Sequence, residues 1–392
     1  MSGPLSGFRI LDLSAVLSGP LATMFLCDQG AEVIKVEPTH GDIVRQMGGG
    51  RSGFSPSFLS ANRGKKSIAV DLKSNEGVDL VKEIARTADV FVQNFRPGAI
   101  ERMGLGYDVI SAIKADIVYC SISGFGEQGP YAHKRVYDPV IQALSGLADI
   151  QRDRETGRPA MIRAVIPDKT TAITSAQAIT AALLARERTG KGQHVKLAMI
   201  DAMIALIWAE GMAGYTVVGD EDKAAPQRAP DLVYQTADGY ITAGAVSNVE
   251  WEGLCRALDR EEWLNDERFN TPNGRVRNVT ERIKITAAVI ATQTSEYWLK
   301  KLDEYSVPCA PVLSRKELLS HEQILANQLI VEMDQQGLGR VRQARPAAKF
   351  SVTPANIQGP APGLGEHTRE LLADLGIKDR DIDKLYASKI IA

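Results

Sequence analysis

The fold is predicted by one stretch, ILDLSAVLSGPLATMFLCDQGAEVIKVEP, which spans residues 10–38. A β-rich apolar run at 9–13 leads through a short loop into a helical pattern at 21–28. A second β-rich run follows at 32–36. Strand, helix and strand in this order form the βαβ unit of a parallel sheet.

The same alternation continues toward the middle of the chain. It predicts a mostly parallel α/β sheet covered by helices on both faces, with ligands at the carboxyl ends of its strands. The further β-rich runs lie at 67–72, 89–92, 117–122 and 194–198, and the helical runs at 76–86, 107–114, 170–188 and 199–211.

A second unit is indicated beyond Gly214, where the composition changes. A polar segment with prolines at 219–230 has the character of a linker, and the runs at 231–235 and 239–243 form a hairpin pattern. Helices are predicted at 251–258, 279–291 and 295–305. Proline and glycine then recur over 346–365, and an amphipathic helix at 368–375 is expected to end the chain.

Composition excludes several classes of protein. The chain has 392 residues, 44% of them hydrophobic, and a formal net charge of −2, so no long-range field favours nucleic acid. The N-terminus lacks a signal-peptide pattern, and no apolar run approaches the ~20 residues of a membrane span. The cysteines are scattered without metal-ligand spacing: Cys27, Cys120, Cys255 and Cys309. We therefore expect a cytoplasmic protein with reduced cysteines, no metal site, no nucleic-acid partner and no membrane partner.

A nicotinamide site is disfavoured in the first βαβ unit. Glu37 ends the second strand, where a ribose-binding acid would stand, but the loop at 14–20 contains only Gly19. Close approach of a pyrophosphate requires several glycines in this loop.

Two later loops carry positive charge. The loop at 94–107 follows a strand and contains Arg96 and Arg102, which suit phosphate groups or simply face solvent. The segment at 123–146 is predicted to be a long glycine-rich loop with a basic patch at 133–135. Its His133 is either a general base or an incidental surface residue.

Asp168 has two interpretations. It precedes the helical run at 170–188, and aspartate is a favoured N-cap residue. The free N–H groups of a helix start also keep a carboxylate ionised and stabilise an oxyanion beside it. Asp168 is therefore either a helix cap or a covalent nucleophile.

An ordered series of motifs extends over nearly the entire chain. After the stretch at 10–38 come NRGKKSIAVDLKS, NFRPGAIERMGLGY, SGFGEQGPY, YDPVIQALSG, Asp168, TGKGQHVKLAMIDAM and YQTADGYI. In this order they resemble the class III CoA-transferases, the CaiB/BaiF family.

The resemblance implies an architecture and an activity. A large Rossmann-like CoA-binding domain (1–200 and 335–392) and a smaller α+β domain (226–325) are expected, joined by linkers at 201–225 and 326–334. Two chains are expected to interlock as a homodimer. The resemblance implies that the enzyme is an acyl-CoA:carboxylate CoA-transferase with no tightly bound cofactor. Its substrates are an acyl-CoA, which carries coenzyme A, and a small carboxylic acid.

The resemblance also assigns residues. The catalytic aspartate corresponds to Asp168, which forms an aspartyl-acyl anhydride and then an aspartyl-CoA thioester. Coenzyme A contacts fall on Val16, Leu17, Ser18, Val70, Asp71, Leu72, Lys73, Asn94, Phe95, Arg96, Arg102, Arg135, Val136, Tyr137 and Asp138.

Departures from the family pattern bear on the substrate. Leu17 stands where the formyl-CoA transferase branch has glutamine, and the segment at 243–248 has one glycine where that branch has a polyglycine lid. Both argue against oxalate and formate and favour a larger or more apolar acyl group. Arg163 could bind a second carboxylate of the substrate or pair with a neighbouring acid.

Two alternatives keep the fold and change the chemistry. An α-methylacyl-CoA racemase of the same family would need a histidine where this chain has Tyr137, and tyrosine is a poor base at neutral pH. A catalytically silent CoA-binding protein would bind coenzyme A without acyl exchange.

Overall fold

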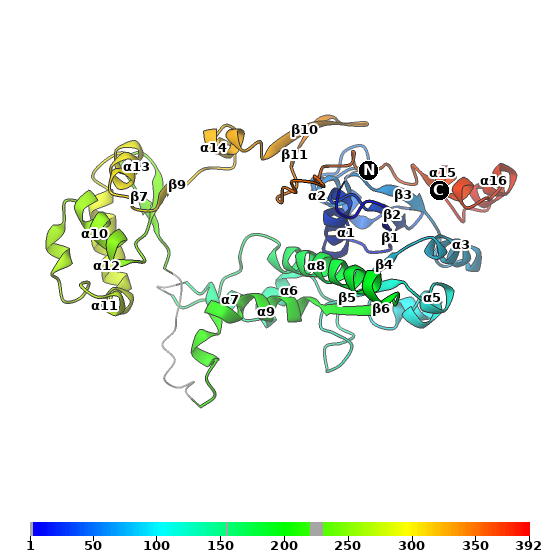
Figure 1. The fold of residues 1–392 in the computed structure, drawn as a ribbon, viewed down its shortest axis with the longest axis horizontal. Helices are drawn as coiled ribbons and strands as arrows, with labels where there is room; N and C mark the ends of the chain where they lie inside the picture. The colour runs from blue at the N-terminus through cyan, green and yellow to red at the C-terminus, as the bar shows by residue number, and fades with distance from the viewer. Residues whose placement is uncertain (1–2, 154–155, 220–229) are drawn as a thin grey trace. The chain divides into compact units, whose positions relative to one another are not determined.

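The computed structural model describes residues 3–153, 156–219 and 230–392. The chain divides into two compact units (Figure 1). Unit 1 comprises Met1–Gln227 and Gln328–Ala392, and unit 2 comprises Arg228–Asn327.

Unit 1 is built on a six-stranded sheet whose paired strands are all parallel, in the order β3-β2-β1-β4-β5-β6. This confirms the predicted α/β sheet. The chain reverses its direction of winding between β1 and β4, and ligands of such sheets bind at that position, beyond the carboxyl ends of the strands. The strands are β1 (Arg9–Asp12), β2 (Glu32–Glu37), β3 (Lys66–Ala69), β4 (Val90–Gln93), β5 (Val118–Ser123) and β6 (Gln193–Ala198).

Helices cover both faces of this sheet because its strands carry apolar side chains on both sides. Leu11 and Phe91 belong to the core beneath α3 (Asn75–Arg86), α5 (Tyr107–Ile113), α15 (Thr368–Asp374) and α16 (Asp379–Ala387). Their neighbours Ile10 and Val92 belong to the core beneath α1 (Ser18–Asp28) and α8 (Ile166–Thr189).

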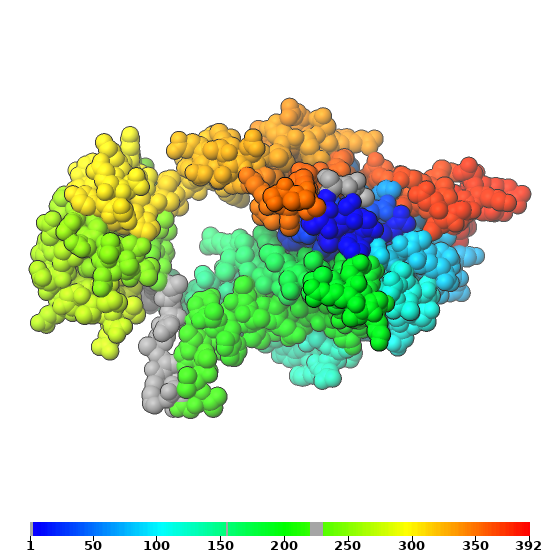
Figure 2. Space-filling model, in the orientation of Figure 1, coloured from blue at the N-terminus to red at the C-terminus, as the bar shows by residue number. Residues whose placement is uncertain are grey.

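The C-terminal part of unit 1 packs against its N-terminal part, and the orange and blue surfaces adjoin in Figure 2. A guanidinium nitrogen of Arg63 donates to the Ala344 carbonyl at 2.7 Å, and the Asn356 N–H donates to the Asp28 carbonyl at 2.9 Å. The remaining elements of unit 1 are η1 (Ile43–Arg45), α2 (Pro56–Asn62), α4 (Ala99–Arg102), α6 (Asp138–Leu144), α7 (Leu147–Ile150), α9 (Met199–Gly211), η2 (Ala213–Tyr215), β10 (Ile330–Gln335) and β11 (Gly339–Ala344).

Unit 2 has its own core, in which Trp251, Phe269 and Trp298 are buried among aliphatic side chains. The predicted hairpin is confirmed: β7 and β8 pair antiparallel, and β9 joins them. The elements are β7 (Val233–Gln235), β8 (Tyr240–Ala243), α10 (Asn248–Ala257), η4 (Glu261–Leu264), α11 (Pro272–Arg277), α12 (Val279–Ile290), α13 (Ser295–Glu304), β9 (Cys309–Pro311), η5 (Glu317–Leu319) and α14 (Glu322–Ala326).

Several sequence predictions need correction. The expected loop at 123–146 is interrupted by α6, which begins at Asp138 because Pro139 is tolerated in a first turn. The helix at 368–375 does not end the chain, since α16 follows it. The two expected linkers, 201–225 and 326–334, overlap α9 and β10 respectively, and α9 buries Met203 in the core of unit 1.

Candidate functional site

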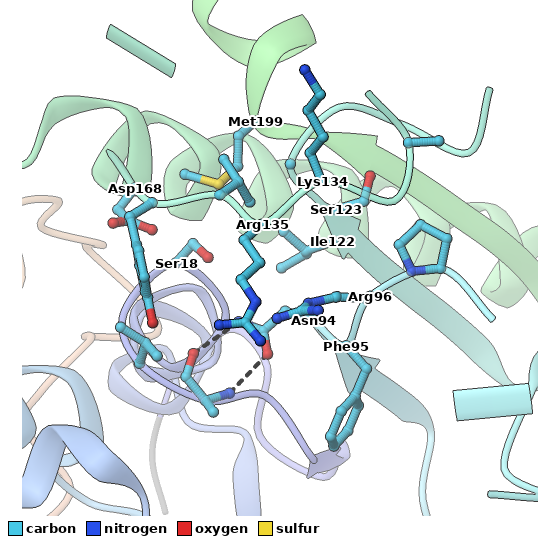
Figure 3. Close-up of a pocket in the computed structure, with 17 residues that line it drawn as sticks. Ser18, Asn94, Phe95, Arg96, Ile122, Ser123, Lys134, Arg135, Asp168 and Met199 are labelled. Carbon is cyan, nitrogen blue, oxygen red and sulfur yellow. Dashed lines mark hydrogen bonds between the residues drawn. The ribbon is translucent and has the colours of Figure 1, made fainter. Parts of the chain in front are cut away.

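A cleft of about 300 Å³ lies beyond the carboxyl ends of β1, β4 and β5, the position that the topology favours (Figure 3). All of its walls belong to unit 1. The lining residues are Ala15, Val16, Ser18, Asn94, Phe95, Arg96, Pro97, Ile122, Ser123, Gly124, Ala132, Lys134, Arg135, Val136, Tyr137, Asp168 and Met199.

Asp168 stands in the first turn of α8 and faces this cleft. The helix begins at Ile166, with Pro167 in its first turn, and the N-cap residue is Val165. The interpretation of Asp168 as an N-cap is therefore wrong, and α8 has no side-chain cap hydrogen bond. The carboxylate is left free for another role.

The environment of Asp168 makes its carboxylate unusually basic. Burial is the main cause, the nearby Asp138 carboxylate adds to it, and together they raise the pKa of Asp168 to about 6. Hydrogen bonding from the hydroxyl and the N–H of Ser18, the first residue of α1, acts in the opposite direction. At pH 7 a group with this pKa is still about 90% ionised, so it combines negative charge with raised basicity.

The buried Asp138 fixes the start of α8. Its carboxylate accepts a hydrogen bond from the Asp168 N–H at 3.2 Å and another from Gln142 at 2.7 Å. Gln142 in turn donates to the carbonyls of Ile162 and Ala164, just before the helix. Two side chains of α6 thus support the backbone that presents Asp168.

Part of the cleft wall comes from the loop Leu13–Leu17, here called the β1–α1 loop. Ala15 exchanges two hydrogen bonds with the Asn94 side chain, both at 2.8 Å, and these appear as dashed lines in Figure 3. Val16 has a φ of 68°, in the left-handed region that β-branched residues avoid. Gly19 is required here, because a Cβ at that position would lie 2.3 Å from Ser14 Cβ.

Positive charge surrounds the single lining carboxylate. Arg96, Lys134 and Arg135 line the cleft and are exposed, and the Lys134 ammonium lies 3.3 Å from the centre of the Tyr131 ring. In the described part of the chain, none of these three cations forms an ion pair with a carboxylate. Exposed, unpaired arginine and lysine side chains suit phosphate groups.

The cleft brings together many of the residues predicted from the sequence: Val16, Ser18, Asn94, Phe95, Arg96, Arg135, Val136, Tyr137 and Asp168. Others lie outside its lining. Val70, Asp71, Leu72 and Lys73 follow β3, two strands away from β1, and Arg102 is exposed at the end of α4. Leu17 is half-buried as the N-cap of α1, and Asp138 acts from behind through the Asp168 N–H.

Sequence reasoning did not assign several lining residues to the site, among them Ser123, Gly124 and Met199. Position relative to the predicted strands could have identified them. Ser123 ends β5 and Met199 directly follows β6, so both lie at the carboxyl edge of the sheet. Gly124 permits a close approach, since a Cβ there would meet Val136 Cγ1 at 2.3 Å.

Histidine is absent from the described residues that line the cleft. His133 and Arg163 are both exposed and do not line it. The described residues also contain no group of three or more His, Cys, Asp or Glu side chains arranged to hold a metal ion. None of the helices described is both long enough and apolar enough to cross a bilayer.

Comparison with known proteins identifies the family. The sequence profile of CoA-transferase family III matches residues 5–368. The chain belongs to this family. Among its relatives, a mouse succinyl-CoA:glutarate CoA-transferase is 39% identical over 99% of this chain and 90% of its own length. A Streptomyces coelicolor formyl-CoA:oxalate CoA-transferase is 33% identical over 99% of both chains.

A solved structure supports the same assignment to the family III CoA-transferases. A CaiB/BaiF family protein from Brucella suis has a TM-score of 0.82 and 31% identity, covering 96% of this chain and all of that one. The fold and the family therefore agree. The relatives are named for different acids, so membership in the family leaves the substrate open.

Proposed function

We propose that this enzyme moves coenzyme A from an acyl-CoA donor to a free carboxylic acid through covalent intermediates on Asp168. The observation that carries the proposal is the basic carboxylate of Asp168, which faces a cleft lined by unpaired cations and by no described histidine. A carboxylate nucleophile suits this exchange because anhydride and thioester links retain the activation of the acyl group.

The reaction begins with attack of an Asp168 carboxylate oxygen on the donor thioester carbonyl, which expels coenzyme A thiolate and forms an aspartyl-acyl anhydride. The thiolate attacks the aspartyl carbonyl, releasing the donor acid and leaving an aspartyl-CoA thioester. The acceptor carboxylate attacks that thioester, forming a second anhydride and freeing the thiolate again. The thiolate then attacks the acceptor's acyl carbonyl, and Asp168 is regenerated.

Neighbouring groups support these steps. The N–H and hydroxyl of Ser18 at the start of α1 stabilise negative charge on Asp168 and on an oxyanion that forms at its carbonyl carbon. Arg96 and Arg135 suit the diphosphate of coenzyme A. The predicted contacts of the β3 edge, Val70 to Lys73, and of Arg102 complete the proposed coenzyme A site.

We propose short dicarboxylic acids of the succinate and glutarate class as the acids exchanged. The mouse relative is named for these acids and shares 39% identity with this chain. The apolar Leu17, in place of the glutamine of the formyl-CoA transferase branch, also disfavours oxalate and formate. The racemase alternative lacks support, because the residue at the position of its histidine is Tyr137 and His133 lies outside the cleft.

The resemblance to the family further suggests an interlocked homodimer. An apolar groove of about 890 Å³ between α1, α8 and the segment after β11 supports association, since Ile173, Leu184 and Phe350 are exposed around it. Light scattering should then give about twice the mass of the 42.5 kDa chain. A monomer in solution would contradict this part of the proposal.

The test is a matrix of acyl-CoA donors and free acids, read by mass detection of the exchanged thioesters. Succinyl-CoA with glutarate is expected to react well, and formyl-CoA with oxalate poorly. Hydroxylamine added during turnover should convert Asp168 to its hydroxamate. Transfer that persists in Asp168→Ala, or solvent deuterium at the substrate α-carbon without transfer, would contradict the proposal.

A further inference from the structure

The β1–α1 loop has an unfavourable backbone conformation at the cleft. Among the non-glycine residues described with positive φ, Val16 is the one with a β-branched side chain. Such a conformation persists only where surrounding contacts enforce it, and it concentrates at functional sites. Position 16 is a valine and not a glycine, so contacts with other residues must hold it in this conformation.

The contacts that hold the loop come from a buried ion pair behind it. The Asp42 carboxylate accepts the Val16 N–H, with its two oxygens at 3.3 and 3.2 Å. The Lys35 ammonium contacts Asp42 at 3.1 Å and donates to the Ser14 carbonyl at 3.0 Å. Both side chains are only 1% exposed, so these interactions form in a region shielded from water.

Asp42 is itself held firmly. It is the N-cap of η1, where its carboxylate accepts the Val44 N–H at 3.1 Å, and its own N–H donates to Glu37 at 3.1 Å. Two guanidinium nitrogens of Arg45 in turn donate to the Glu37 carboxylate, at 2.7 Å each. The Asp42 carboxylate, which accepts the Val16 N–H, is therefore part of a rigid buried network of hydrogen bonds and ion pairs.

The conformation of Val16 affects the surroundings of Asp168 through the two residues that follow Val16 in the chain. Val16 is followed by Leu17 and then Ser18, which lines the cleft together with Asp168 and whose hydroxyl and N–H lower the pKa of the Asp168 carboxylate. We infer that Asp42 and Lys35 are positioning residues that hold Val16 in its left-handed conformation and thereby aim the start of α1 at Asp168. This inference rests on the proposed function, because it assigns the pair a role in CoA transfer.

The central experiment is a double-mutant cycle on residues 16 and 42. Asp42→Ala should let residue 16 relax out of the left-handed region, and kcat should fall about 100-fold while KM for the acyl-CoA changes less than about threefold. Val16→Gly removes the steric penalty at that position, so the Val16→Gly/Asp42→Ala variant should recover much of the kcat lost.

The pH profile gives a readout that a purely structural role would not move. If Ser18 no longer stabilises the Asp168 anion, the acid limb of kcat/KM should shift to higher pH by about one unit in Asp42→Ala and return in the double variant. The charged groups around Asp168 are unchanged by the substitution: Asp138 on α6, which raises the pKa of Asp168, and the cations Arg96, Lys134 and Arg135, which line the same cleft.

Two further variants serve as a replacement and as a control in this experiment. If Asp42→Ala fails to fold because Lys35 is left unpaired, the Lys35→Met/Asp42→Ala variant removes both charges and takes its place in the cycle. Asp28→Ala is the matched control. It breaks the buried Arg63–Asp28 pair, at 2.6 Å, which has no contact with the β1–α1 loop, and should leave kcat and the acid limb unchanged.

A crystal structure of the Asp42 variant, or of its charge-neutral replacement, completes the test. Residue 16 outside the left-handed region, together with rescue of kcat by Val16→Gly, supports the inference. Retention of the left-handed conformation, or a kcat loss that Val16→Gly leaves unchanged, overturns it. Failure of the proposed function would instead appear as absence of CoA transfer in the wild-type enzyme, or as transfer that survives Asp168→Asn.

Discussion

Two aspartates at the same edge of the sheet, the fully buried Asp12 and the half-buried Asp168, have opposite electrostatic environments. Asp12 ends β1, where Lys65 contacts it at 2.9 Å and the Thr23 hydroxyl at 2.6 Å. Burial alone would raise the pKa of Asp12, but Lys65, Lys35 and two hydroxyl groups outweigh it and lower the pKa to about 2. Asp168 has no such cation, and its pKa rises to about 6.

Asp12 and Asp168 show what separates a structural carboxylate from a reactive one in this fold. Each lone pair of Asp12 is already directed at a fixed partner, so the group is stabilised as an anion and is a poor nucleophile. The Asp168 carboxylate faces a cleft and is less stabilised, so bond formation to an acyl carbon relieves part of its unfavourable burial. The two lysines around Asp12, which have no counterpart among the groups that shift the pKa of Asp168, separate the two roles.

The largest expected effect follows from Asp168→Asn. Because the proposed nucleophile is lost, kcat for CoA transfer should fall by about 10⁴-fold or more. The fold should be retained, and unfolding in urea should show unchanged or slightly higher stability, since a destabilised buried charge is removed. Appreciable residual turnover in a folded variant would assign the nucleophile elsewhere.

Asp12→Ala should produce the opposite pattern, in which stability falls. It leaves Lys65 fully buried without its carboxylate, and the free energy of unfolding should fall by about 3–5 kcal/mol. Adding Lys65→Met removes the unpaired charge and should restore part of that loss. If Asp12→Ala unfolds at the wild-type urea concentration, the Asp12–Lys65 pair does not have the structural role described.

The two pKa shifts predict effects at different pH. Activity requires ionised Asp168, so kcat/KM should decline about tenfold per pH unit below its pKa of about 6. The depressed pKa of Asp12 contributes stability that is complete above its ordinary value of 3.8 and is lost as pH falls toward 2. Activity should therefore disappear at a higher pH than structure, as parallel activity and circular dichroism titrations can measure. Simultaneous loss would contradict the separation.

The smallest effect is expected at the rim of the cleft. Lys134→Ala removes an exposed cation proposed to attract phosphate, so KM for the acyl-CoA should rise about threefold to tenfold, mostly at low salt, with little change in kcat. Lys191→Ala, at an exposed turn, is the matched control and should leave KM unchanged. Equal effects of the two substitutions would show that Lys134 contributes only general charge.

Much of the large unit was predictable because its pattern is local. Each strand is a short apolar run followed by a helix, and this fixes a parallel sheet and the edge at which ligands bind. Helix boundaries near proline were harder to predict from the sequence. Pro139 and Pro167 both look like interruptions, yet both stand in first turns, which hid α6 and moved the start of α8 ahead of Asp168.

The electrostatic contrast could not be predicted from the sequence alone. Asp12 and Asp168 each follow an apolar run, and one of the lysines that separate their roles lies 53 residues away from Asp12 along the chain. The left-handed conformation of Val16 could not be predicted either, because local preference opposes it and the residues that hold it, Asp42 and Lys35, are distant in sequence. Long-range polar contacts, unlike periodicity, leave no local signal.

Oxygen tracing can show whether Asp168 becomes covalently linked during turnover. An acceptor acid labelled with ¹⁸O in its carboxylate should leave one heavy oxygen in the Asp168 side chain after a turnover, because the bridging oxygen of the second anhydride stays with the enzyme. Peptide mass spectrometry should find the label in the peptide containing Asp168, and later turnovers should pass it to the released donor acid whenever the heavy oxygen is the one that attacks the donor. Continued CoA exchange with no label in Asp168 would contradict the account.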